Sequence, residues 1–181
     1  MSQAVTPLVS GEKVDFRRVF QTEFGWVMRT LRYLGIQSRD LEDVTHDVFL
    51  HVYRHFPDYD PARPLRPWLY AFAYRIARDF RALRRHGHHL MDDTASIADS
   101  APLADALLMR SELQALALEA LEALDSDERA VFVAHDLDEM AAPEIAEALE
   151  IPLNTAYSRL RRARTKFENA AKRLAAKEKY R

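Results

Sequence analysis

Cysteine is absent from this 181-residue chain, and glycine occurs only four times. Without thiols the sequence can form no disulfide, no thiolate metal site and no cysteine nucleophile. The few glycines and few β-branched runs disfavour strands and hairpins. No stretch approaches the ~20 apolar residues that span a bilayer, and the N-terminal MSQAVTPLVSGEK lacks the apolar run of a secretion signal. We therefore expect an all-α protein that acts in the cytoplasm, with no membrane insertion.

Net charge is also small, at −2, but it is unevenly distributed. Residues 1–90 carry 14 basic and 10 acidic side chains, residues 91–150 carry 2 and 16, and residues 151–181 carry 10 and 2. A basic end that follows an acidic middle is typical of a nucleic-acid footprint placed on one element. The acidic segment can serve a basic protein partner, or it can keep the free protein off DNA.

The most informative stretch is MAAPEIAEALEIPLNTAYSRLRRARTKF, residues 140–167. Pro143 suits the first turn of a helix, whereas Pro152 cannot lie inside one, so two short helices flank a tight turn. The second helix has one apolar side, because its apolar residues recur at spacings of 3 and 4. These residues are Leu153, Ala156, Leu160, Ala163 and Phe167. The whole unit predicts a helix-turn-helix.

The opposite side of the second helix is polar and basic. It carries Asn154, Ser158, Arg161, Arg162 and Thr165, flanked by Thr155, Tyr157, Arg159 and Arg164. Such a helix can pack one face on its domain and insert the other into the major groove. Arginine bonds guanine bidentately, asparagine bonds adenine, and serine or threonine bonds phosphate. The alternative is an amphipathic surface helix whose arginines are only solvated.

Two helices are expected before residue 57. The first spans about residues 14–34, with apolar residues at helical spacing, and Gly35 ends it. Ser38 or Asp40 caps the second, which runs to about Phe56. Its inward residues are Leu41, Val44, Val48 and Val52, and its outward residues are Glu42, Asp43, His46 and Asp47.

A proline-rich loop, PDYDPARPLRP (residues 57–67), separates the second helix from a third. Pro67 opens this third helix, which carries arginines beside Trp68 and follows Arg63 and Arg66 of the loop. Aromatic groups among arginines suit unpaired bases, because every base has a face to stack on and a phosphate to neutralise. The alternative is a core tryptophan on a solvated basic helix.

The rest of the chain is expected to comprise a linker, two further helices and a basic tail. Residues 86–101 show no stable periodicity and are interpreted as an interdomain linker. One helix spans about residues 102–124, and Asp125 or Ser126 caps the next, over residues 127–137. The basic tail, residues 170–181, is expected to fray at its end.

Seven histidines raise the possibility of a metal site. His51 and His55 are four residues apart, which is compatible with a shared metal, but Val52 stands where the zinc-protease motif needs its glutamate. A histidine-dependent metalloenzyme is therefore a weak alternative. We expect no metal, no cofactor and no catalytic motif.

Three segments together resemble the extracytoplasmic-function (ECF) sigma factors, which are initiation subunits of bacterial RNA polymerase. DLEDVTHDVFLHVYRHF (40–56) resembles the family's DAEDLxQDxF segment, RPLRPWLYAFAYRIARD (63–79) its promoter-melting segment, and ERAVFVAHDLDEMAAPEIAEALEIPLNTAYSRLRRAR (128–164) its region four. The likeness covers about residues 16–174. It implies that the chain is no enzyme, and that its partners are core RNA polymerase, promoter DNA and an optional anti-sigma factor.

The resemblance also implies roles for residues. Those docking on polymerase would be Asp40, Glu42, Asp43, His46 and Asp47. Those holding the opened downstream strand would be Arg63, Arg66, Trp68, Tyr74, Arg75 and Arg78. Those reading the upstream duplex would be Asn154, Thr155, Tyr157, Ser158, Arg159, Arg161 and Arg162. The implied domains are residues 1–90 and 105–181, joined by an acidic linker at 91–104.

Four positions depart from the family pattern. His46 stands where the family often has Gln, and Arg75 where it often has Asn. Glu150 replaces the usual turn glycine, so the turn must avoid a positive φ or accept strain. Ala141 replaces a serine cap, which removes a bond worth about 1 kcal/mol. A stand-alone helix-turn-helix regulator that binds duplex DNA without polymerase is the other open interpretation, although it leaves the segment around Trp68 unexplained.

Overall fold

The structure is a computed structural model that describes residues 15–87 and 104–179. Within those ranges the chain forms α-helices and no strand, which confirms the all-α prediction. The helices are α1 (Phe16–Tyr33), α2 (Leu41–His55), α3 (Leu65–Gly87), α4 (Ala104–Leu121), α5 (Ser126–Phe132), α6 (Ala142–Ala148) and α7 (Leu153–Lys179). Most of the predicted linker lies outside the described residues.

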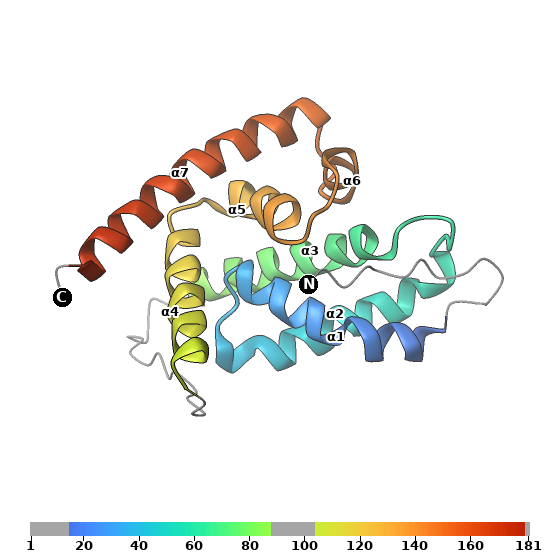
Figure 1. The fold of residues 1–181 in the computed structure, drawn as a ribbon. Coiled ribbons are helices and arrows are strands. Elements are labelled where there is room, and N and C mark those ends of the chain that lie inside the picture. The colour runs from blue at the N-terminus through green and yellow to red at the C-terminus, as the bar shows by residue number, and fades with distance from the viewer. Residues whose placement is uncertain (1–14, 88–103, 180–181) are drawn as a thin grey trace.

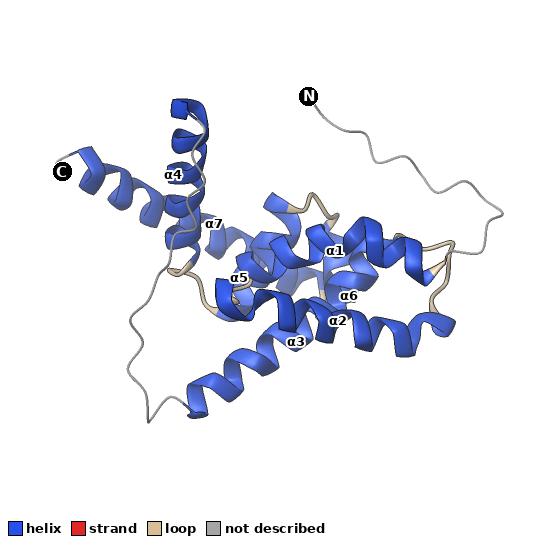
Figure 2. Cartoon of the chain, turned by 90° about the horizontal axis from the view of Figure 1, so that it is seen from below, coloured by secondary structure: helices blue, strands red, loops and turns tan. Residues whose placement is uncertain are grey.

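The helices form two layers. Figure 1 shows α1, α2 and α3 side by side in one layer, α7 crossing above them, and α5 and α6 between the two. From below, α1–α3 lie in front of α5 and α6, whereas α4 and the end of α7 project to one side (Figure 2). The first half of the chain therefore supports the helix-turn-helix of the second half.

Local sequence sets the ends of α1. The Asp15 carboxylate accepts a bond from the Arg17 backbone N–H, which is an N-cap. At the other end Gly35 has a φ of 93°, and the Ile36 N–H bonds back to the Leu31 carbonyl at 3.0 Å. This left-handed turn closes the helix, as expected for glycine after a C-terminus.

The packing of α2 follows its predicted pattern. Its four predicted inward residues, Leu41, Val44, Val48 and Val52, are all buried between α1 and α3. Asp40 occupies the N-cap position but makes no capping bond, because its carboxylate instead accepts a bond from Arg84 of α3 at 3.0 Å. The cap position was thus predicted correctly, but its bond was not.

The two halves share one apolar core. Buried residues of α1–α3, such as Val27 and Leu69, belong to the same cluster as Val131 of α5 and Ile145 of α6. A polar bond crosses within this core, where the buried Tyr70 hydroxyl donates to the Ala130 carbonyl at 2.7 Å. Burying a hydroxyl without a partner is unfavourable, so this bond favours one relative placement of α3 and α5.

The helix-turn-helix consists of α6, a turn and α7. Ala141 is the N-cap of α6 and supplies no side-chain bond, but Glu144 accepts a bond from the Ala141 N–H at 3.0 Å, which is half of a capping box. In the turn Glu150 adopts a φ of 55°. The turn therefore accepts the left-handed conformation without glycine, at a cost of about 1–2 kcal/mol.

The predictions were wrong in two places. The basic tail predicted over residues 170–181 is not a separate segment, because α7 continues to Lys179; the predicted fraying at its end falls on residues 180–181, outside the described residues. The apolar side of α7 extends through buried Ala170, and the helix packs along α4. In addition, α3 begins at Leu65 rather than Pro67; the proline falls within the first turn, where its missing N–H leaves no helical bond broken.

Candidate nucleic-acid interface

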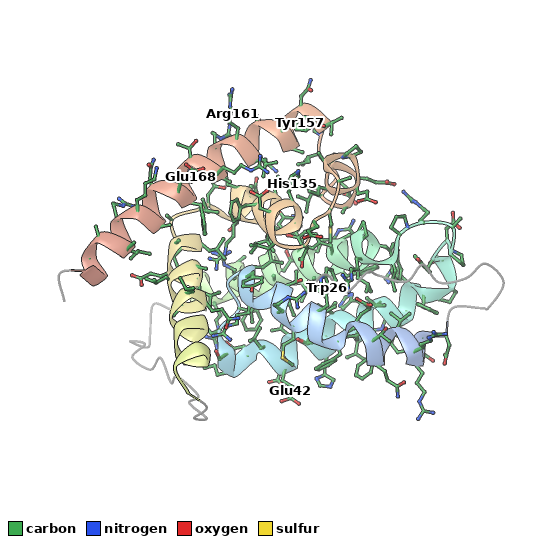
Figure 3. The ribbon with its side chains drawn as sticks, in the orientation of Figure 1. Trp26, Glu42, His135, Tyr157, Arg161 and Glu168 are labelled. Carbon is green, nitrogen blue, oxygen red and sulfur yellow. The ribbon has the colours of Figure 1, made fainter. Side chains whose placement is uncertain are left out.

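The outer face of α7 is open to solvent. Asn154, Tyr157 and Arg161 are exposed there, with Tyr157 52% exposed. Figure 3 shows Tyr157 and Arg161 pointing away from the rest of the molecule. Among the described residues no carboxylate pairs with the Arg161 guanidinium. These three predicted side chains are therefore free to contact a ligand.

The remaining arginines of the predicted face bond to carboxylates of their own half. Arg159 donates to Asp127 at 2.5 Å, and Arg162 donates to Glu128 at 3.1 Å. Glu128 is buried, with a side chain 3% exposed, and also accepts a bond from Lys166 at 2.6 Å. Ser158 bonds within α7, since its hydroxyl donates to the Thr155 backbone carbonyl at 2.9 Å.

Arg164 flanks the same face and bonds to a carboxylate of the π-helical turn beneath α7. It donates from Nε to Asp136 at 2.8 Å. Burial raises the pKa of the Asp136 carboxyl, but the bonds from Arg164 and His135 outweigh burial and lower the pKa below its ordinary value. The arginines beside Arg161 thus anchor α7 on α5 and on the π-helical turn Val133–Leu137.

The second candidate surface lies on the loop before α3 and on α3 itself. Arg63 and Arg75 are about half exposed, and each pairs with a carboxylate of the C-terminal half: Arg63 with Glu147, and Arg75 with Glu150. The other two predicted arginines pair within the first half. Arg66 donates to Glu23 at 3.0 Å, and Arg78 donates to Asp79 at 3.2 Å.

The aromatic residues of this surface are partly or wholly covered. Trp68 is half-buried in a cluster with Tyr59 and Phe72, whose ring centroids lie 4.8 and 5.0 Å away. Tyr74 is 9% exposed, and its hydroxyl donates to Asp127 at 3.2 Å. Burial, followed by the Asp127 charge, raises the pKa of the Tyr74 hydroxyl. Trp68 thus lies between the two predicted environments: part of its ring packs in the aromatic cluster, and part is exposed to solvent.

A cavity of about 280 Å³ lies where the loop, α3 and α6 meet. One wall carries Tyr59, Arg63, Trp68 and Arg75, and the facing wall carries Glu147 of α6. Three of the six predicted strand-binding residues, Arg63, Trp68 and Arg75, therefore line one cavity, whereas Arg66, Tyr74 and Arg78 do not. Glu144 and Glu147 of the other half also line this cavity.

The predicted polymerase-docking residues lie on α2. Glu42, Asp43, His46 and Asp47 are exposed on one face, and Figure 3 shows Glu42 on the side of the molecule away from α7. Asp40 does not belong to this exposed face, because its carboxylate bonds to Arg84 and helps to pack α2 on α3. Leu50 and Tyr53, which the sequence analysis did not single out, are also exposed on α2.

Neither a metal centre nor a membrane span emerges from the described ranges. His55 bonds the His51 carbonyl and lies beside the ring of Phe72, and no group of three ligating side chains gathers within residues 15–87 and 104–179. No described helix is long and apolar enough to cross a membrane.

Sequence reasoning missed the carboxylates that meet these arginines. They are Asp127, Glu128, Asp136, Glu147 and Glu150. The available signal was the excess of 16 acidic over 2 basic residues in 91–150, which indicated a basic partner without indicating that the partner is this same chain.

Comparison with known sequences places both halves. The sequence model of Sigma-70 region 2 matches residues 19–89, and that of Sigma-70 region 4 matches residues 114–167. RNA polymerase sigma factor CnrH of Cupriavidus metallidurans is 30% identical over 167 residues, covering 87% of each chain. RNA polymerase sigma factor NccH of Alcaligenes xylosoxydans xylosoxydans is 27% identical, again covering 87% of each chain. The ECF RNA polymerase sigma-E factor of Escherichia coli is 25% identical and covers 77% of this chain and 78% of that protein.

Solved structures show the same fold. CnrH in complex with the cytosolic domain of CnrY matches with a TM-score of 0.62 at 25% identity, covering 88% of this chain and 89% of that one. Sigma factor RpoE of Bartonella quintana, in complex with the anti-sigma factor NepR, matches with a TM-score of 0.68 at 17% identity, covering 87% and 97%.

Proposed function

This chain belongs to the ECF sigma factors of bacterial RNA polymerase, and we propose that its exposed surfaces divide the work of promoter recognition among α2, α3 and α7. As a sigma factor it acts with core RNA polymerase and promoter DNA. The main support for this division of roles is that the outer face of α7 is open to solvent, whereas its opposite side packs on α5. The stand-alone regulator is not favoured, because both sigma regions match.

The upstream duplex element is read by α7. Asn154, Tyr157 and Arg161 supply the base contacts, since their side chains are exposed and Arg161 has no competing carboxylate. Thr155 and Ser158 lie at the start of the helix, where hydroxyls can reach phosphates. Arg159 and Arg162 keep α7 in place and add positive charge near the backbone.

The opened downstream strand is held by the loop before α3 and by α3. Arg63, Arg66, Arg75 and Arg78 neutralise phosphates, and Trp68 offers part of its ring to a base. Tyr74 joins this surface only when α5 moves away from it. Taking a base out of the duplex costs a few kcal/mol, which stacking and charge neutralisation offset.

Core polymerase docks on the exposed face of α2. Its acidic residues are Glu42, Asp43 and Asp47, with His46 between them. The sigma factor itself makes no covalent bond, and polymerase performs the chemistry in the bacterial cytoplasm. We keep residues 1–90 and 105–181 as the two domains and 91–104 as their linker.

An anti-sigma factor is the further partner proposed for this sigma factor. CnrH, which is 30% identical to this chain, has been solved with the cytosolic domain of CnrY, and the fold also occurs in a sigma factor bound to NepR. We propose that a comparable partner holds this chain inactive until a signal releases it.

Docking is tested by reversing charge on α2. Asp43→Lys together with Asp47→Lys should weaken the binding of core polymerase by at least about tenfold, because like charges then face the partner's basic surface. A pull-down of core polymerase measures this, with helicity checked by circular dichroism. The matched control reverses two exposed carboxylates elsewhere, Glu119→Lys and Glu168→Lys. Equal affinity of both variants would remove α2 as the docking site.

A further inference from the structure

The strand surface proposed above is covered by the chain's own carboxylates. Arg63 pairs with Glu147 of α6, and Arg75 pairs with Glu150 of the following turn. A carboxylate that bonds an arginine occupies the same donors that a phosphate would use. In this arrangement two of the four arginines of the strand surface, Arg63 and Arg75, are therefore already neutralised by the other half of the chain.

Glu150 occupies an unusual position for this pairing. Its φ of 55° is a conformation that glycine adopts freely and glutamate does not. Arg75 and Glu150 are also two of the four positions at which the sequence departs from the family pattern, and they meet in space although 75 residues separate them. The strained backbone therefore lies at a residue whose side chain pairs with an arginine of the other half.

Exposed ion pairs contribute little free energy on their own, so the association of the two halves depends mainly on buried contacts. The Trp26 Nε1–H and the Thr30 hydroxyl of α1 donate to the two oxygens of Asp138, at 2.8 and 3.0 Å. Arg129 of α5 is 1% exposed and donates to the Tyr33 carbonyl at 2.5 Å. Water can replace each of these polar partners when the halves separate, so the interface can open without leaving unpaired groups.

We propose that the free protein closes on itself, with Glu147 and Glu150 occupying the cationic surface that otherwise holds the opened promoter strand. This proposal rests on the strand-binding role proposed for α3. Closure does not affect the outer face of α7, where Tyr157 and Arg161 remain exposed (Figure 3). The closed state therefore blocks capture of the single strand and leaves the duplex-reading face accessible.

The consequence for binding is quantitative. When only the open fraction of molecules can bind a ligand, the apparent dissociation constant rises in proportion to the inverse of that fraction. Removing the covering carboxylates should thus strengthen single-strand binding, whereas loss of an ordinary structural contact would weaken it. The opposite signs make the two roles distinguishable.

The first test uses the full chain without polymerase. Glu147→Gln together with Glu150→Gln should raise affinity for a fluorescent mixed-sequence single-stranded oligonucleotide by about threefold or more, measured by anisotropy. The control, Glu119→Gln with Glu168→Gln, removes the same charge from α4 and α7. An equal rise in both variants would be a general charge effect and would overturn the proposal, as would no rise in the first.

Glu150→Gly separates the contact from the strain. Glycine accepts the φ of 55°, so the thermal midpoint should not fall, while single-strand affinity should rise because the carboxylate is gone. Closure itself can be followed by pulsed electron paramagnetic resonance, which measures the distance between spin labels attached at His51→Cys and Asn169→Cys. The chain has no native cysteine that would also be labelled. The distance distribution should lengthen only modestly in Glu150→Gly, because an exposed ion pair contributes little free energy to closure, and an unchanged distribution would overturn closure by this contact.

Failure of closure and failure of the proposed function give different results. In the Glu147→Gln/Glu150→Gln background, Arg63→Ala with Arg75→Ala tests the strand surface directly. If these changes lower single-strand affinity but the carboxylate changes never raised it, closure is wrong and the strand surface stands. If the arginine changes have no effect, the strand-binding role itself is wrong.

Discussion

The two arginine-rich helices, α3 and α7, differ in where their neutralising carboxylates come from. Those of α7 belong to α5 and the adjoining π-helical turn, in the same half of the chain. Two of the carboxylates that meet the α3 surface belong to α6 and its turn, in the other half. Arginine content alone therefore does not indicate an available binding surface. The exposed residues of α7 remain exposed whether or not the two halves of the chain separate. Arg63 and Arg75 of the α3 surface become available to a ligand only when the halves separate.

This difference also sorts the arginines by task. An arginine that satisfies a buried carboxylate is needed for folding, because the carboxylate would otherwise lose a partner in a dry environment. Arg162 is of this kind, since Glu128 is buried beneath it. Arg161 is the opposite case, exposed and without a carboxylate partner among the described residues. Neighbouring residues on one helix should thus respond differently to the same substitution.

The largest expected effect comes from comparing these neighbours. Arg161→Ala should cost about 1–3 kcal/mol at one upstream base pair and relax preference there, with stability unchanged. Arg162→Ala should instead lower the free energy of unfolding by about 1.5–3 kcal/mol, because Glu128 loses a charged hydrogen bond. Holoenzyme binding to promoters varied only in the upstream element, with parallel urea unfolding, measures both. If both variants keep wild-type base preference, α7 does not read bases through these arginines.

A second comparison tests whether the α3 side is covered at all. Tyr70→Phe removes the buried hydroxyl that donates to the Ala130 carbonyl, so unfolding free energy should fall by about 1–2 kcal/mol. Tyr157→Phe removes an exposed hydroxyl of α7 and should change it by less than about 0.5 kcal/mol. Urea unfolding of the full chain measures both. Equal stabilities would mean that α5 does not rest on α3 in solution.

What the sequence could predict was local. The apolar stripe of α7 and the inward face of α2 follow from spacings of three and four residues, and burial of Ala156, Leu160 and Val48 confirms them, although Leu153 at the start of the stripe is 39% exposed. Gly35 as the end of α1 is confirmed for the same reason, since a helix C-terminus needs only its own neighbours.

What the sequence could not predict involves partners distant along the chain. Trp26 and Asp138 are 112 residues apart, and Arg63 and Glu147 are 84 apart. An excess of acidic residues indicates that they will pair with basic side chains. It does not indicate which ones, because the pairing depends on how the two halves pack. The length of α7 was missed for a related reason: Ala170 is helical because α4 lies against it.

The smallest expected effect is a pH dependence of closure, and it concerns Asp138. Burial raises the pKa of this carboxyl above its ordinary 3.8, although bonds from Thr30 and Trp26 and the charges of Arg29 and Arg66 act in the opposite direction. In the open state the carboxyl regains water and its ordinary pKa. The closed state therefore binds the proton more readily, so acid favours closure, and closure weakens as pH rises from 3.8 through the raised pKa.

Asp138→Asn isolates this contribution, because asparagine does not titrate. The distance between labels at His51→Cys and Asn169→Cys should lengthen in the wild type as pH rises above 3.8, and should lengthen less in the variant. Titration of Asp136 occurs in both proteins and cancels in the difference. A variant slope equal to or steeper than the wild-type slope would contradict a raised Asp138 pKa. Because the outer face of α7 lies outside this contact, upstream base preference should be the same for both proteins across the range, and a parallel loss of that preference would mean that the covered and open surfaces are coupled after all.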